Sequence, residues 1–400
     1  MIARKRIDIG WGDFAHAAGA CCGLVRRPAA GGAALLTRRA DALVCLSVRS
    51  GFDLLLAELA LPAGSEVLVS AITIPDMTRI LIEHELVPVP VDVDPETLDV
   101  DPCSLAARLT PATRAVLVAH LFGSHLALRD VIGWAHDRGL LVLEDCAQAF
   151  TADDFAGHEA SDVRMFSFGT IKTATALGGG VLLVKDATLL ARLRQRHEAW
   201  PVQPTGQYFR KILKFAFFRP LLLPPLYGIL MRAIRLLGRD PDAMITRLGR
   251  GFAGGNFFER LRHRPCAALV DLIDHRLATY DAGRVRQRAA AGERVLARLK
   301  TLRPVGAQAA DRTHWLFPLR APNRKELMPR LARAGFDATC ASSSLFALPD
   351  VPGHPAPRAA TAAMAQVLYI PVYHEMGPAR LDRLADLLNE IAETPAPPRI

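Results

Sequence analysis

The feature that most constrains the fold of this chain is a regular alternation of strand-like and helix-like segments between Ala42 and Lys185. Helix-length segments lie at Phe52–Leu61, Met77–Glu85 and Leu126–Asp137. This alternation predicts an α/β fold, a mostly parallel sheet with helices on both faces. Functional loops are then expected at the carboxyl ends of the strands. The apolar runs typical of strands are Leu43–Val48, Glu66–Val69, Leu86–Val93, Arg114–His120, Leu140–Glu144 and Val181–Val184.

The length and the later pattern predict a second, smaller domain. The chain has 400 residues, and half of them are hydrophobic. This length is greater than that of one simple domain, so two domains are expected. A long helical pattern covers Arg264–Leu299. After it, strand patterns at His314–Leu319 and Val367–Pro371 mix with helical patterns at Arg324–Ala334 and Pro378–Glu393. We predict a large domain over residues 1–255 and a small C-terminal α+β domain over residues 256–400.

The first stretch with chemical meaning is Ser50-Gly51-Phe52, at a strand end and a helix start. A small residue and a glycine there let backbone N–H groups approach a phosphate, which the positive end of the helix dipole also favours. Ser-Gly is also common at such junctions for steric reasons alone.

The second stretch is Glu144-Asp145, at the end of an apolar strand, with Gln148 three residues later. A carboxylate at this place can lie beside the pyridine nitrogen of pyridoxal phosphate (PLP) and keep that nitrogen protonated. Gln148 can donate to the phenolic oxygen of the ring. The alternative is an aspartate that only caps the next helix.

The third stretch runs from Ser167 to Lys172 and is followed by a glycine cluster, Gly178–Gly180. A lysine confined at the end of an apolar strand loses its proton more easily than a surface lysine. Ser167 can reach a phosphate. A lysine near glycines is otherwise an ordinary solvated residue.

Together these stretches resemble the DegT/DnrJ/EryC1/StrS family of sugar aminotransferases, which have the aspartate-aminotransferase fold (PLP fold type I). The family shows Ser-Gly-Thr, then Glu-Asp-Ala-Ala-Gln-Ala, then Phe-Ser-Phe with a lysine five residues after that serine. The matching segments are Ser50-Gly51, Glu144–Ala149, Phe166–Phe168 with Lys172, Val91–Leu98, Leu109–Thr113 and His120–Gly123.

The resemblance implies a role for each matching residue. Lys172 would hold PLP as a Schiff base, and Asp145 would pair with its pyridine nitrogen. Gln148 would contact the phenolic oxygen, while Ser167 and the Ser50-Gly51 backbone would hold the phosphate.

Three departures from the family pattern also concern the cofactor. Ile74 follows Thr73 where relatives carry an aromatic residue that stacks on PLP. Phe52 replaces a threonine hydroxyl that helps with the phosphate. The Gly-Tyr-Asn-Tyr-Arg stretch of the family has only Gly255-Asn256-Phe257 as its nearest counterpart.

The resemblance implies an aminotransferase that moves an amino group from an amino acid, with glutamate as the expected donor, to a nucleotide-linked keto-sugar. It also implies a homodimer, because this fold usually completes each active site with partner residues. Two alternatives stay open. One is a non-catalytic or regulatory descendant of the fold, and the other is a PLP enzyme of different chemistry that acts on a lipid-linked substrate at the membrane.

Cysteines and charge favour a cytoplasmic protein. Seven cysteines without a CxxC pair indicate reduced thiols and provide no zinc site, so we expect no metal. Asp8 and Asp13 interrupt what would be the apolar part of a signal peptide. The net charge is +9, but seven of the cations lie between Trp200 and Asp240, where there is no acidic residue. The rest of the chain carries only +2, so the charge does not indicate nucleic-acid binding.

That basic segment, within an insertion at residues 205–240, contains two amphipathic pieces, Tyr208–Phe218 and Leu226–Leu237. The longest uncharged run, Pro220–Met231, has twelve residues. As a helix it would reach roughly 18 Å, less than the roughly 30 Å of a hydrocarbon core. Its composition fits peripheral contact of residues 208–239 with an anionic membrane. A dimer contact or a lid over the active site is the alternative.

Overall fold

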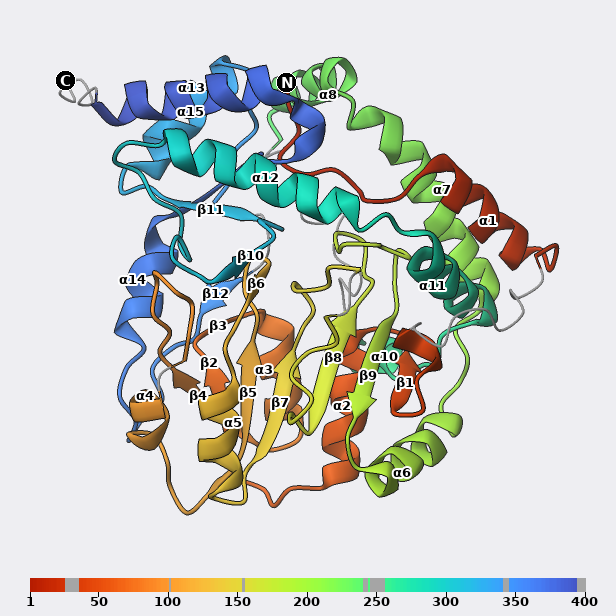
Figure 1. Ribbon diagram of the computed structural model, residues 1–400. Coiled ribbons are helices and arrows are strands. Elements are labelled where there is room, and N and C mark those ends of the chain that lie inside the picture. Colours follow the sequence, from red (N-terminus) through yellow and green to blue (C-terminus); the bar gives the residue numbers. More distant parts are fainter. Residues whose placement is uncertain are drawn as a thin grey trace.

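A seven-stranded sheet forms the centre of the computed structural model, which describes residues 1–25, 36–100, 102–152, 155–239, 244, 256–340 and 345–393 (Figure 1). The strand order is β1-β9-β8-β7-β5-β2-β4. The five strands from β8 to β4 are parallel, and β9 is antiparallel to both of its neighbours. The predicted α/β fold with a mostly parallel sheet is confirmed. The strands are β1 (Ala42–Cys45), β2 (Glu66–Ser70), β4 (Val87–Val91), β5 (Thr113–Ala119), β7 (Leu141–Asp145), β8 (Val163–Ser167) and β9 (Gly180–Val184).

Helices bury both faces of this sheet. Val116 and Val118 of β5 pack in a cluster with α5, whereas Ala115 and Leu117 pack with α2 and α3 on the opposite face. Alternate side chains of a strand point to opposite faces, so a strand covered on both sides is apolar at every position. The helices around the sheet are α1 (Trp11–Cys21), α2 (Val48–Leu59), α3 (Pro75–Glu83), α4 (Pro102–Ala106), α5 (Arg129–His136), α6 (Ala187–Glu198), α10 (Phe257–Leu261) and α11 (Ala267–Thr279).

The C-terminal elements form a second core above the sheet (Figure 1). Val295, Phe317 and Leu384 belong to this core, and Ile2 joins it from the other end of the chain. The elements are α12 (Gly283–Arg298), β11 (Phe317–Arg320), α13 (Arg324–Arg333), α14 (Arg358–Gln366), β13 (Val367–Ile370) and α15 (Pro378–Glu393). Two short two-stranded sheets pair β3 (Ile72–Thr73) with β12 (Phe346–Ala347) and β6 (Ser124–His125) with β10 (Asp311–Arg312). The 3-10 turns are Leu36–Arg38 and His374–Met376.

The predicted domain boundary falls at residue 255, which lies outside the described residues. In the described part that follows, α10 and α11 pack in the clusters of the large sheet, with Phe257 and Leu269 as members. Packing against the C-terminal core begins with α12.

Strand β4 lies at one edge of the sheet and alternates valine with proline, Val87-Pro88-Val89-Pro90-Val91. Val87 donates to Ser65, and Val91 accepts from Ala71, so the valines bond towards β2. The prolines therefore occupy the positions whose backbone points away from the sheet.

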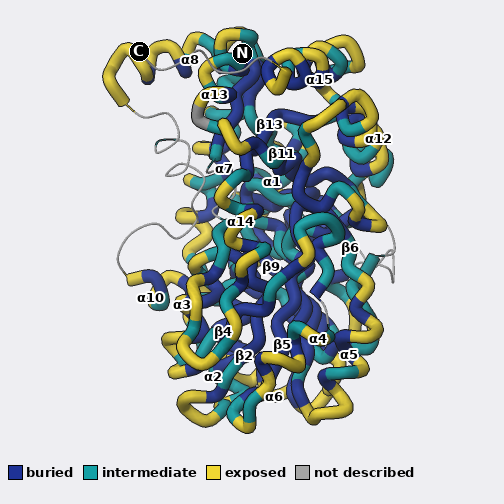
Figure 2. Tube along the Cα trace, turned by 90° about the vertical axis from the view of Figure 1, so that its left-hand side faces the viewer, coloured by how far each residue is buried: buried dark blue, intermediate teal, exposed yellow. Residues whose placement is uncertain are grey.

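The insertion folds as two helices, α7 (Thr205–Leu221) and α8 (Pro224–Leu236), as its two amphipathic pieces predicted. Among the described residues no single helix is long and apolar enough to cross a membrane. Together α7 and α8 reach that length and composition, but they bend by 99° at the break between them. Figure 2 shows the C-terminal part of α8 as exposed chain at one margin of the molecule.

Candidate active site

The carboxyl ends of the parallel strands open into a cavity of about 790 Å³. Asp145 ends β7, Ser167 ends β8, and Lys172 lies in the loop from β8 to β9. The structure thus brings together side chains that the sequence placed in separate motifs, at the edge of the sheet where they were expected. The predicted site residues that line the cavity are Ile74, Asp145, Gln148, Ser167 and Lys172.

Lys172 is held by its backbone and by an aromatic ring. Its N–H donates to the Gly169 carbonyl, and its Nζ lies 4.4 Å from the centre of the Trp315 ring. Burial lowers the pKa of Lys172 to about 8, with Asp145 acting to raise it and Arg49 to lower it further. At pH 7 roughly a tenth of this amine is therefore neutral and nucleophilic, far more than of an ordinary lysine.

Asp145 and Gln148 are fixed through one side-chain oxygen each. Asp145 Oδ1 accepts from the Ala147 N–H at 2.9 Å, and Gln148 Oε1 accepts from the Phe122 N–H at 2.9 Å. Burial raises the pKa of Asp145, while the Ala147 N–H and the Lys172 charge oppose that rise. A buried carboxylate of this kind is stabilised by a cation beside it, and the bond from Phe122 leaves the Gln148 amide N–H₂ as a donor.

The helix at the cavity begins earlier than the sequence indicated. Ser47 caps α2, and its Oγ accepts from the Ser50 N–H at 3.1 Å. Ser47, Val48 and Arg49 line the cavity, and Arg49 forms an ion pair with Asp76 at 2.7 Å.

The predicted residues Ser50, Gly51 and Phe52 are fully buried within the first turns of α2. Phe52 packs in the cluster on that face of the sheet. A Cβ built on Gly51 would lie 2.2 Å from Leu182 Cδ1, so this glycine lets α2 approach β9 closely.

Ile74 and Ser167 also line the cavity. Ile74 precedes α3, whose first residue, Pro75, favours a helix start. Its aliphatic side chain packs partly against the core and partly faces the cavity. Ser167 Oγ accepts from the Gly169 N–H at 3.4 Å, a long bond that leaves the hydroxyl proton available to a ligand.

Two cavity residues, Trp315 and Lys5, were not predicted from the sequence. Trp315 donates its Nε1–H to the Ile171 carbonyl, and the amine of Lys5 lies 3.4 Å from the centre of its ring. Burial, then Lys172 and Arg288, lower the pKa of Lys5, and its amine has no hydrogen-bond partner among the described residues. No local pattern marks Lys5, because its position depends on contacts with residues more than 300 positions away.

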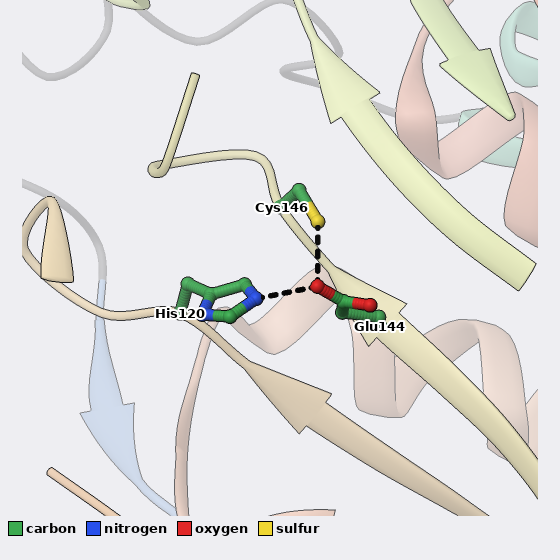
Figure 3. Close-up of side chains that lie close together, drawn as sticks. All are labelled: His120, Glu144 and Cys146. Atoms are coloured by element: carbon green, nitrogen blue, oxygen red, sulfur yellow. Dashed lines mark hydrogen bonds and ion pairs between the residues drawn. The ribbon is translucent and has the colours of Figure 1, made fainter. Parts of the chain in front are cut away.

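A buried cluster joins His120, Glu144 and Cys146, of which the last two flank Asp145 in the sequence (Figure 3). His120 Nδ1 accepts from the Leu126 N–H, so its Nε2 carries the proton and donates to Glu144 at 2.7 Å. Burial raises the pKa of Glu144, but the bonds from His120, Ser161 and the His158 N–H outweigh it, and the net shift is downward. Both imidazole nitrogens are occupied, so this cluster anchors the strand ends and offers no free histidine lone pair to a metal ion.

Sequence comparison identifies the family over part of the chain. Residues 33–217 match the profile of the DegT/DnrJ/EryC1/StrS aminotransferase family. An L-glutamine:2-deoxy-scyllo-inosose aminotransferase of Streptomyces kanamyceticus is 34% identical over 155 residues, which are 37% of this chain and 36% of that protein. The GDP-perosamine synthase of Caulobacter vibrioides is 29% identical over 179 residues, 44% of this chain and 48% of that protein. The matches thus span less than half the length of these relatives.

Structural similarity extends over nearly the whole chain. The sugar aminotransferase CalS13 of Micromonospora echinospora aligns with a TM-score of 0.63 at 20% identity, over 98% of this chain and 100% of that chain. NtdA of Bacillus subtilis, solved with bound cofactor PMP, aligns with a TM-score of 0.66 at 16% identity, over 96% of this chain and 83% of that chain. These alignments confirm the predicted fold. Residues 33–217 are therefore similar to the DegT/DnrJ/EryC1/StrS aminotransferase family, as the motifs in this part of the chain predicted.

Proposed function

We propose that this protein is a PLP-dependent aminotransferase that moves an amino group from an amino acid, with glutamate as the expected donor, to a nucleotide-linked keto-sugar. The observation that carries the proposal is that the Lys172 amine, with its pKa lowered to about 8, shares one cavity with the Asp145 carboxylate. This chemistry needs an amine that bonds to the cofactor and a carboxylate that keeps the ring nitrogen protonated, and one cavity contains both.

The residues present fit PLP. Asp145 offers a buried carboxylate to a protonated ring nitrogen, and Gln148 keeps an amide donor for the phenolic oxygen. The N-terminus of α2, with Ser47 and Arg49 at the cavity, and the Ser167 hydroxyl suit the phosphate. Ile74 can cover one ring face by apolar contact alone.

Lys172 acts as both the attachment point and the proton carrier in this proposal. When bound, PLP supplies an electron sink for the charge left as the donor loses its α-proton. Once the donor has displaced it, the neutral Lys172 amine would accept this α-proton and deliver it to the carbon on the other side of the donor nitrogen, a 1,3 shift. Trp315 beneath the amine restricts its movement and keeps water from that side.

The same proposal covers assembly and location. We infer a homodimer by analogy with the fold, and a cytoplasmic protein that contacts the inner face of the membrane peripherally through residues 208–239. All seven cysteines carry free thiols, which supports a reducing compartment.

The test is to load the protein with PLP and record its visible absorption, beside Lys172→Ala and Lys5→Ala variants. We expect a band in the wild type and in Lys5→Ala that is absent in Lys172→Ala and bleaches on addition of glutamate or glutamine. Sodium borohydride should then fix the cofactor to the peptide that contains Lys172, as read by mass spectrometry. Cofactor fixed to Lys5, or no band at all, would contradict the proposal; the latter outcome would favour a non-catalytic descendant of the fold.

A further inference from the structure

The helices α7 and α8, here called the α7–α8 pair, form one wall of the cavity that contains Lys172. Their inner side chains line it, including Tyr208 and Phe215 from α7 and Tyr227 and Met231 from α8. These four side chains are all buried. The cavity therefore runs from a polar end at the sheet to an apolar wall on the pair.

Lys211 lies between the two ends. A Cβ built on Gly178, in the glycine cluster after Lys172, would lie 3.8 Å from Lys211 Nζ. Burial, then Lys214 and Arg49, lower the pKa of Lys211 to about 8. The structure shows no hydrogen-bond or ion-pair partner for this amine among the described residues, so a bound anion would complete its surroundings.

The outer side of the pair is apolar and basic together. Phe217, Ile229 and Leu236 are 68%, 66% and 81% exposed. Seven of the large hydrophobic side chains exposed in the described part of the chain belong to residues 213–237. The pair and its flanks carry seven cations and no acid between Trp200 and Asp240. The exposed cations of the described segment are Arg210, Lys214, Arg232, Arg235 and Arg239.

Charge decides between two partners for this outer side. A twofold contact with a second copy would place the same acid-free, basic patch against itself, and like charges across an interface are unfavourable. An anionic lipid surface offers the opposite charge and a place for leucine and phenylalanine side chains at the headgroup boundary. The 99° bend between α7 and α8 fits a pair that lies on a surface.

We propose that the α7–α8 pair docks on an anionic lipid surface, and that the cavity behind it takes a carbonyl substrate joined through a phosphate-type anion to a long apolar chain. The carbonyl end reaches Lys172, the anion lies at Lys211, and the chain follows the apolar wall towards the lipid. The substrate part rests on the proposed amino transfer at Lys172 and puts a lipid-linked carbonyl compound in place of the nucleotide-linked keto-sugar, whereas the docking part is independent of the activity.

Docking is tested with the full-length protein and sedimented vesicles at low ionic strength. We expect it to bind vesicles that contain phosphatidylglycerol, to stay in solution with pure phosphatidylcholine, and to dissociate as salt is raised. The double variant Phe217→Ser/Ile229→Ser should lose binding, and Ile82→Ser, which removes an equally exposed isoleucine on α3, should not. Wild-type protein that remains in the supernatant overturns the proposal. So does a double variant that converts a dimer to a monomer, because the face would then be a subunit contact.

The substrate class is tested by calorimetry with farnesyl phosphate, farnesol and inorganic phosphate. We expect farnesyl phosphate to bind at least about tenfold more tightly than either control, since each control lacks one of the two contacts. Lys211→Met should remove most of this preference over farnesol, and Met231→Gln should weaken both prenyl ligands, with unfolding midpoints as the check on folding. Equal affinity for all three probes overturns the substrate assignment. Lys172→Ala should bind farnesyl phosphate normally even if it loses PLP, which separates this result from a failure of the proposed function.

Discussion

At the scale of single residues, two lysines in one cavity have their pKa lowered to about 8 for different reasons. Lys172 is desolvated but faces Asp145, which moves its pKa back upward. Lys211 is desolvated and has only other cations, Lys214 and Arg49, as its main electrostatic neighbours. The first amine is thus prepared to exchange its proton, and the second to bind an anion that restores its charge.

The rate at which the apoprotein takes up PLP should report the lowered pKa of Lys172. Only the neutral amine attacks an aldehyde, so the rate should rise with pH and level off above about 8, rather than continue towards the 10.5 of an ordinary lysine. Asp145→Asn removes the carboxylate that raises this pKa, so its midpoint should lie at lower pH. Stopped-flow absorption measures both profiles, and an Asp145→Asn midpoint above that of the wild type would contradict the assigned electrostatics.

At the scale of elements, different residues at the start of α2 serve the cavity and the packing of the helix on the sheet. Ser47 caps the helix and faces the cavity, whereas Gly51, one turn later, faces β9. In the Ser-Gly pattern, Gly51 is explained by close packing, and Ser50 is buried with its N–H bonded to Ser47 Oγ. The part of the helix start that lines the cavity is Ser47–Arg49 instead.

Gly51→Ala should destabilise the protein by about 1–3 kcal/mol, because the added methyl overlaps Leu182. The free energy of unfolding in denaturant measures the change. In a Leu182→Ala background the same substitution should cost much less, since the overlapping Cδ1 is absent. An equal cost in both backgrounds would mean that backbone effects, and not this contact, make Gly51 necessary.

Local pattern predicted most elements of the fold well. The helix predicted at Pro378–Glu393 has these bounds in the structure, and the six predicted strands all belong to the central sheet. The helical pattern of Arg264–Leu299 divides into α11 and α12, because the chain becomes extended at Tyr280. The Tyr280 hydroxyl donates to Asp8, a contact far away in sequence that no helical periodicity reveals.

The candidate site was predictable only where its residues follow strands. Asp145, Gln148, Ser167 and Lys172 line the cavity because they follow neighbouring strands of a parallel sheet. Lys5 comes from the N-terminal segment and Trp315 from just before β11, so tertiary packing and not local sequence places them there.

At the scale of the whole molecule, the N-terminal segment ties the two cores together. Ile2 pairs with Phe336, and Arg4 forms an ion pair with the buried Asp337 at 2.6 Å. Tyr227 of α8 also donates to Asp337. The wall of the cavity formed by α8 and the segment that carries Lys5 therefore share one buried carboxylate.

The proline-bearing edge of the sheet also affects how the molecule behaves in solution. Pro88 and Pro90 have no N–H to donate outward, and the Pro90 carbonyl accepts from the buried guanidinium of Arg108 at 2.6 Å. Arg108 also donates to the Ser104 and Pro355 carbonyls, so it is firmly fixed.

Pro88→Thr/Pro90→Thr should increase light scattering on mild heating, while Pro111→Thr, in an exposed turn, should not. Equal scattering of both variants would argue against the edge as the cause.

A foreign strand that approached β4 would thus meet two missing donors and an occupied acceptor in place of a template for pairing. Pairing along this edge is therefore disfavoured, and the two missing donors have this effect in a partly folded chain as well, because they do not depend on tertiary contacts. The same chemistry excludes a dimer made by continuing the sheet through β4, so subunits that associate near it must do so through side chains of helices and loops.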